Sequence, residues 1–71
     1  MVEFFPLLSQ VTNLRAVGVG QAIEVRADEK FYSHGTIARV DEQHGIVWVR
    51  TKYESCQIFN DRDFTFWRYI I

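Results

Sequence analysis

Five short runs, in which apolar residues alternate with polar ones or β-branched residues follow one another, restrict the possible folds of this chain most strongly. In the first run, Ile23 and Val25 alternate with Glu24 and Arg26. A period of two is typical of a strand with one buried face and one solvated face. The strands predicted in this way span residues 22–27, 35–40, 46–51, 56–59 and 64–71. The sequence therefore predicts a mainly β protein.

Polar or glycine-containing segments separate these runs and predict the connections between strands. Residues 41–45 end in a glycine, which can adopt the left-handed conformation that tight hairpins often require. Residues 60–63 predict a polar turn, with one short helical turn capped by Asn60. Residues 28–34 predict a loop that carries two aromatic side chains.

Residues 1–19 follow a different pattern. Leu7, Leu8, Val11 and Leu14 lie near the i, i+1, i+4 and i+7 positions of one helical face. A proline directly before them suits the first turn of a helix. The spacing therefore favours a short helix. The alternative is an extended arm that lies along the rest of the domain as an extra strand.

The length of 71 residues allows one domain, in which residues 1–19 pack on residues 20–71. A chain of this size buries roughly 60% of the surface that it exposes when unfolded. Its core is expected to supply only about 3–5 kcal/mol of stability. Cys56 is the single cysteine and cannot form an internal disulfide, and His34 and His44 add too few ligands for structural zinc. Association with a partner is the remaining source of stability.

The charge balance argues against a chain that mainly binds phosphates. Eight basic and nine acidic residues give a formal net charge of −1, whereas nucleic-acid-binding domains normally carry a basic excess. No segment has the roughly 20 consecutive apolar residues that span a membrane. The apolar start lacks the basic leader of a secretory signal. Together with the unpaired cysteine, these features predict a cytoplasmic protein.

Motifs for catalysis are missing from the sequence. There is no recognisable Ser/His/Asp or Cys/His spacing, no glycine loop for phosphates and no metal motif. Cys56 lies in an alternating apolar stretch, which predicts a buried and inert thiol. Asp61 and Asp63 follow Asn60 and are interpreted as turn residues. We expect a protein that is not an enzyme and that uses no cofactor or small-molecule substrate.

The order of strands and turns over residues 20–64 resembles the SH3-like barrels of the KOW and Tudor families. The residues that carry the resemblance are Gly20, Ile23-Glu24-Val25, Phe31-Tyr32, Gly35-Thr36-Ile37, Val40 and Gly45-Ile46-Val47-Trp48-Val49. Where Tudor domains usually have an Asp-Tyr-Gly turn, this chain has Lys52-Tyr53-Glu54. The resemblance implies a five-stranded SH3-like barrel, with the N-terminal helix or arm packed on it. It also implies nucleic acid (KOW) or a methylated side chain (Tudor) as ligand.

A four-residue loop between the second and third strands sets their predicted register. The inward pairs are Val40 with Val47, Ala38 with Val49 and Thr36 with Thr51. Arg39 then faces Trp48, and Ile37 faces Arg50, on the outer side. Tryptophan and arginine are enriched at binding hot spots, so these four residues are candidate partner contacts. The alternatives are that the N-terminal segment covers them, or that Arg39 stacks on Trp48 as a surface pair.

The last predicted strand is apolar on both faces, and such a strand must be covered on both sides. The N-terminal segment or another subunit would provide this cover. Phe66, Trp67 and Tyr69 therefore join the candidate partner contacts.

A second candidate surface lies at the predicted rim, where Tudor-like barrels bind their ligands. It comprises Lys30, Phe31, Tyr32, Lys52 and Tyr53. These aromatic rings could stack on nucleobases or surround a methylated ammonium. The alternative is that they close the ends of the barrel.

The sequence thus predicts a non-catalytic binding module that docks on a protein partner or associates with itself. The alternative hypothesis is nucleic-acid binding through Arg39, Arg50, Lys52 and the rim aromatics.

Overall fold

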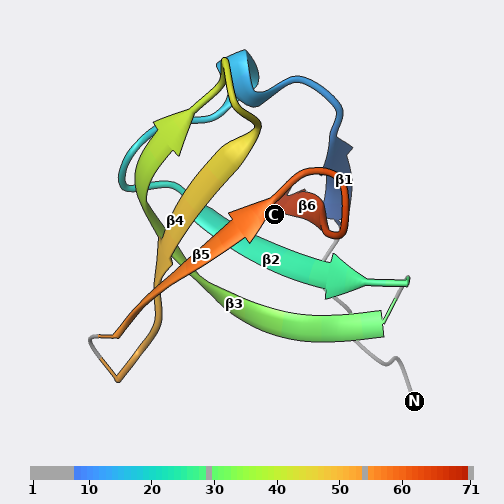
Figure 1. The fold of residues 1–71 in the computed structure, drawn as a ribbon. Coiled ribbons are helices and arrows are strands. Elements are labelled where there is room, and N and C mark those ends of the chain that lie inside the picture. Colours follow the sequence, from blue (N-terminus) through green and yellow to red (C-terminus); the bar gives the residue numbers. More distant parts are fainter. Residues whose placement is uncertain (1–7, 29, 54, 71) are drawn as a thin grey trace.

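The computed structural model describes residues 8–28, 30–53 and 55–70, which form one antiparallel sheet and a single turn of 3-10 helix (Figure 1). The elements are β1 (Leu8–Val11), η1 (Leu14–Ala16), β2 (Ala22–Ala27), β3 (Lys30–Asp41), β4 (Ile46–Arg50), β5 (Cys56–Asn60) and β6 (Thr65–Tyr69). The strand order in the sheet is β1-β6-β2-β3-β4-β5. The prediction of a mainly β protein is confirmed.

The N-terminal segment extends the sheet and does not form the predicted helix. β1 pairs antiparallel with β6, and Val11 lies opposite Phe66. After β1 the chain makes only η1, whose N-cap is Asn13, and Leu14 enters the core from it. The helix prediction was wrong for the described residues, and the alternative of an added strand is confirmed. Residues 1–7 lie outside the described part of the chain.

β3 is longer than predicted, because residues 30–34 continue the strand where a loop was expected. A bulge in the β2–β3 pairing accommodates them: Val25 lies opposite Ser33 and Arg26 lies opposite Phe31. Tyr32 is the extra residue between these two pairs. A bulge changes the direction of the neighbouring side chains. Phe31 and Tyr32, which were predicted to lie in a loop, therefore belong to β3 on either side of this irregularity.

A second bulge, at Ala38, changes the predicted register between β3 and β4. Arg39 lies opposite Trp48 as expected, but Ile37 pairs with Val49 and not with Arg50. Ile37 consequently points inward and is 1% exposed. The prediction that Ile37 lies on the outer surface was wrong. The extra residue Ala38 shifts the alternation by one position, so the side chain of Ile37 points into the core.

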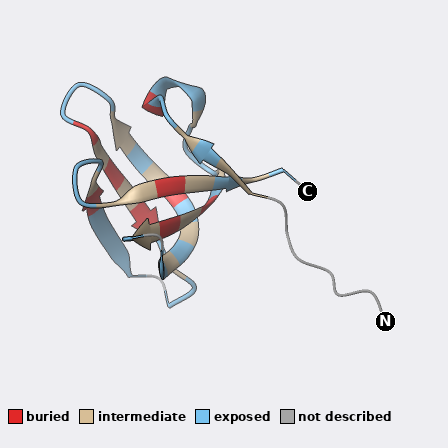
Figure 2. Ribbon diagram, turned by 90° about the vertical axis from the view of Figure 1, so that its right-hand side faces the viewer, coloured by how far each residue is buried: buried red, intermediate tan, exposed pale blue. Residues whose placement is uncertain are grey.

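The core is formed by side chains from every strand except β1, together with η1. Its buried members are Leu14, Ile23, Val25, Ile37, Val47, Val49, Phe59 and Phe66. The sheet coils so that β4 and β5 cross over β2 and β3 (Figure 1), which brings the buried positions together on its inner side. Figure 2 shows buried positions mainly within the strands, with most connecting turns exposed.

Gly35 lies where the backbone of β3 comes very near the end of β4. A Cβ atom placed there would lie 2.2 Å from the Arg50 carbonyl oxygen and 3.0 Å from a Val49 methyl group. Only a glycine lets the two backbones come this close. The polar turn predicted after β5 is confirmed, since the Asn60 side chain accepts hydrogen bonds from the N–H groups of Arg62 and Asp63.

Among the described residues, no helix has the length and apolar character to cross a membrane.

Candidate functional site

Cross-strand pairs place a tryptophan at the centre of the outer surface of β3, β4 and β5. Trp48 lies between Arg39 of β3 and Ile58 of β5. In the neighbouring row, Arg50 of β4 lies opposite Cys56 of β5. Paired residues of an antiparallel sheet share one face. We call the surface formed by Arg39, Trp48, Arg50, Cys56 and Ile58 the Trp48 face.

The apolar centre of the Trp48 face is only partly covered by the chain itself. The Arg39 guanidinium lies 4.8 Å from the centroid of the Trp48 ring, so the two side chains stack on each other. Trp48 is half-buried, whereas its neighbour Ile58 is 63% exposed. β1 pairs at the other end of the strand order and leaves these side chains uncovered.

The two arginines of the Trp48 face, like Arg62 and Arg68, form no ion pair among the described residues. Arg15 and Arg26 form ion pairs with Glu42 and Glu24, respectively. In the described part of the chain, Arg39 and Arg50 have no carboxylate within ion-pair distance. Two arginines without an ion-pair partner among the described residues therefore flank the Trp48–Ile58 pair.

One carboxylate lies at the end of this outer surface. Asp41 pairs across the sheet with Ile46, next to the Arg39–Trp48 pair. The His44 ring donates a hydrogen bond from Nδ1 to the Asp41 carboxylate at 2.8 Å. This hydrogen bond holds the pKa of the Asp41 carboxyl below its usual value, with a smaller contribution from the positive charge of Arg39. Asp41 and Arg39 therefore interact through their charges, although they form no ion pair among the described residues.

β5 is the last strand of the sheet, and only one of its edges is paired with another described strand. Cys56, at its start, is an exposed free thiol. The prediction of a buried thiol was wrong, because the alternation places Gln57 opposite Val49 and turns Cys56 to the outside opposite Arg50.

The predicted contacts on the last strand are covered by the chain itself. Phe66 is 2% exposed and belongs to the core, so its prediction as a partner contact was wrong. Trp67 is half-buried beneath Arg26, whose guanidinium lies 4.6 Å from the ring centroid, and its Nε1 donates to Thr65 Oγ1 at 3.0 Å. Burial raises the pKa of the half-buried Tyr69, and the charge of Glu24 adds to this rise. Residues of the same chain therefore already cover much of the apolar surface of β6, and a partner is less necessary there than the apolar sequence of this strand predicts.

The structure brings four of the five rim residues together. Phe31, Tyr32, Lys52 and Tyr53 line one cavity of about 280 Å³, whereas Lys30 does not line it. Phe31 and Tyr53 are 61% and 78% exposed, and the Lys52 ammonium lies 5.1 Å from the Tyr53 ring centroid.

Tyr32 has a different role from the other rim aromatics. Its ring packs edge-on against Phe59 and Phe64, at centroid distances of 5.8 and 5.2 Å. Phe59 is a core residue and Phe64 packs against the core. Tyr32 therefore packs against the margin of the hydrophobic core although its side chain is 56% exposed, while Phe31 lies beside His34.

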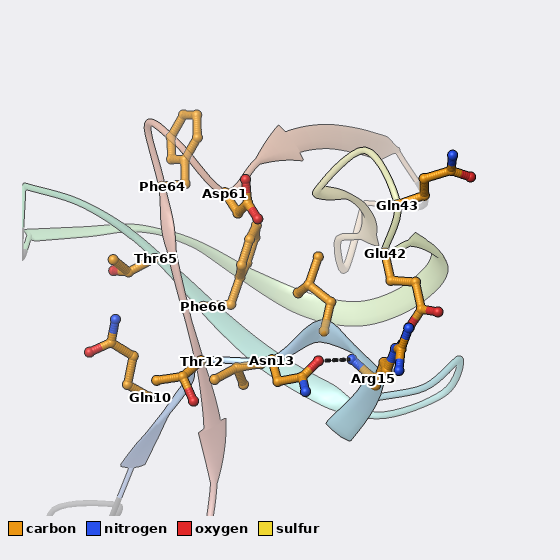
Figure 3. A pocket seen from close by; sticks show the side chains of 12 residues that line it. Gln10, Thr12, Asn13, Arg15, Glu42, Gln43, Asp61, Phe64, Thr65 and Phe66 are labelled. Atoms are coloured by element: carbon orange, nitrogen blue, oxygen red, sulfur yellow. Dashed lines mark hydrogen bonds and ion pairs between the residues drawn. The ribbon is translucent and has the colours of Figure 1, made fainter.

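A larger concave surface was missed by the sequence reasoning. We call it the Asp61 groove; it has a volume of about 720 Å³ (Figure 3). It is bounded by the end of β1, η1, the β3–β4 turn, the β5–β6 turn and β6, with side chains such as Gln10, Asn13, Glu42, Asp61 and Phe66. These segments are far apart in the sequence. In the sequence, these segments are marked only by polar turn residues, and such residues are equally common in turns that form no binding site.

Within the described part of the chain, no three His, Cys, Asp or Glu side chains gather as a metal site would require. The described surfaces thus offer stacking, apolar contact and charge pairing.

Comparison of the chain with protein-family models, with curated proteins and with solved structures finds no match.

Proposed function

We propose that this protein is a non-catalytic binding module whose Trp48 face docks on an extended segment of a protein partner. The segment would carry acidic side chains beside apolar ones. The observation that carries this proposal is the Trp48–Ile58 pair, which is partly exposed and flanked by Arg39 and Arg50, neither of which has an ion-pair partner among the described residues.

The physical chemistry of the Trp48 face favours a protein ligand. Tryptophan and arginine supply much of the binding energy at protein interfaces, especially where apolar contact excludes water from charged pairs. The open edge of β5 can hydrogen-bond to the backbone of an added strand. Acidic side chains on that strand would pair with Arg39 and Arg50, while apolar ones would contact Ile58.

Nucleic-acid binding through Arg39, Arg50, Lys52 and the rim aromatics is the weaker alternative. The net charge is −1, and Asp41 lies on the same outer surface as the two arginines. Proteins that bind phosphates normally present a larger basic excess. The Trp48 face offers two positive charges. A peptide with two acidic side chains matches this number better than a nucleic acid, which carries a phosphate at every nucleotide.

We further propose that the sheet is an SH3-like barrel of the KOW and Tudor type. The strand order β6-β2-β3-β4-β5, the turn between β3 and β4 and the short turn between β5 and β6 support this assignment. The added strand β1 would then be the arm packed on the barrel.

Selection of binders from a random peptide library displayed on phage tests the function. We expect the selected peptides to be rich in Asp and Glu alternating with apolar residues. Their synthetic versions should change the tryptophan fluorescence of the protein. Arg50→Glu and Ile58→Ser should each weaken this binding by about tenfold, which corresponds to about 1.4 kcal/mol.

Arg62→Glu is the matched control, because Arg62 is an exposed arginine on the β5–β6 turn, outside the Trp48 face. It should leave the affinity unchanged. Selection of basic peptides, or equal loss in the Arg50 and Arg62 variants, would contradict the proposal. Binding of a single-stranded oligonucleotide that weakens steeply with salt, in place of peptide binding, would favour the alternative.

A further inference from the structure

We infer that the Asp61 groove is a second binding site, which takes the cationic side chain of a lysine or arginine from another protein. This inference is independent of the Trp48 face, since none of the residues of that face lines the groove.

The floor of the groove is apolar and continuous with the core. Leu14 and Phe66 are buried members of the core, and Val11 and Phe64 pack against it. Figure 3 shows Phe66 within the cavity, between Asp61 and the segment that holds Asn13. An apolar floor of this kind suits the methylene stem of a lysine or arginine, which packs on apolar surfaces while its charged end stays near water.

The polar wall of the groove carries a carboxylate without a partner. Asp61 accepts no side-chain hydrogen bond and forms no ion pair with any residue that the structure describes. Its position is nevertheless fixed, because its N–H donates to the Gly45 carbonyl at 2.9 Å. The carboxylate lies directly against Gly45, where a Cβ atom would meet it at 2.4 Å.

The other two charged residues of the groove neutralise each other. Arg15 lies 3.2 Å from the Glu42 carboxylate across the gap between η1 and the β3–β4 turn (Figure 3). The groove is therefore lined by one cation and two anions. Arg15 pairs with Glu42, and the charge of Asp61 is left without a partner among the described residues. Gln10, Asn13 and Gln43 add amide groups that can hydrogen-bond to the rest of a bound segment. Charge complementarity selects a cation over an anion as the occupant.

NMR titration of the whole chain with N-acetyl-arginine amide and N-acetyl-lysine amide, at low salt, tests the site. N-acetyl-norleucine amide serves as the uncharged probe with a similar stem. We expect the cationic probes to shift backbone amides of residues 12–15, 42–43 and 61–65, and these shifts to decrease with added salt.

Two variants should change the affinity in opposite directions. Asp61→Asn should weaken binding of the cationic probes by about twofold to fivefold, the range for one exposed charge pair. Arg15→Gln should tighten it by a similar factor, because it removes the competing cation and releases Glu42. Both side chains are exposed, so the fold should be retained.

Asp28→Asn is the matched control, since it removes the same charge from the β2–β3 turn, outside the groove. Asp28 has a positive φ of 52°, which asparagine also adopts readily. The inference is overturned if the uncharged probe causes the same shifts, or if Asp61→Asn and Asp28→Asn bind the cationic probes equally well. Either result would leave the peptide-binding proposal intact.

Discussion

At the scale of single residues, backbone spacing decides which positions tolerate a side chain. Gly35 pairs with Ile23 of β2, directly before Thr36, where the pairing of β3 with β4 begins. The nearest atoms to an added Cβ belong to the backbone of Arg50, and a strand within a sheet cannot move aside locally. A methyl group at this position would push β3 and β4 apart.

Gly35→Ala is therefore expected to destabilise the fold by about 1–3 kcal/mol, the usual cost of overpacking. Urea unfolding followed by tryptophan fluorescence measures this loss. Gly18→Ala is the control, because nothing lies within 4 Å of an added Cβ there. It should be neutral or stabilising by up to about 1 kcal/mol, through a less flexible unfolded chain. Equal stability of the two variants would contradict the close approach.

The Asp41–His44 contact predicts a pH dependence. The hydrogen bond from His44 lowers the pKa of the Asp41 carboxyl in the folded state. The contact therefore stabilises the fold above the pKa of the unfolded chain, and this stabilisation is lost as the pH falls through the lowered folded value. In a carbon NMR titration, His44→Ala should raise the midpoint of Asp41.

His34→Ala is the control for this titration, because His34 lies on β3 beside Phe31 and makes no contact with Asp41. It should leave the Asp41 midpoint where it is. An identical midpoint in the wild type and in His44→Ala would show that the hydrogen bond does not persist in solution.

The limits of sequence-based prediction are also visible at single residues. The β3–β4 turn and the Arg39–Trp48 pair could be predicted, because alternation and a glycine-ended turn specify them locally. The bulge at Ala38 could not be, since alanine suits either face and carries no pattern of its own. That one extra residue decided whether Ile37 was a surface contact or part of the core.

At the scale of elements, the N-terminal segment shows how tertiary contacts override a helical spacing. The apolar positions of residues 8–14 are compatible with a helix face. In the structure, Val11 reaches the core from β1 and Leu14 reaches it from η1. The edge of β6 offers β1 a partner with backbone hydrogen bonds, and no local signal reveals that edge. The same reason explains why the Asp61 groove was not predicted.

Docking of η1 on the sheet predicts a measurable role for Leu14. Leu14→Ala should cost about 2–3 kcal/mol, near the lower end of the range for buried leucines because the residue lies at the margin of the core. Val19→Ala is the control in urea unfolding. Its side chain is 73% exposed, so it should change the stability by no more than about 0.5 kcal/mol. A cost for Leu14→Ala as small as that of the control would mean that η1 is not docked.

At the scale of the whole molecule, eight buried apolar residues form the core of the described chain. Cys56 is its single cysteine and is an exposed free thiol, so no internal disulfide adds to this core. A core of this size supports a free energy of unfolding of about 3–5 kcal/mol. Any ligand that binds only the folded state adds to this value by mass action. Stability and binding are therefore closely linked in so small a protein.

This linkage gives a prediction for the proposed function that does not depend on spectroscopic changes at the site. A peptide bound at the Trp48 face should raise the free energy of unfolding by about 2.7 kcal/mol when present at 100 times its dissociation constant. That increase would equal roughly half to nine-tenths of the stability expected for the free protein. Urea unfolding with and without the peptide measures it.

Arg50→Glu should unfold like the wild type without peptide, because its side chain is exposed and has no ion-pair partner among the described residues. It should gain much less from the peptide at the same concentration, whereas Arg62→Glu should gain as much as the wild type. If saturating peptide leaves the unfolding midpoint of the wild type unchanged, the fluorescence response does not report binding to the folded Trp48 face.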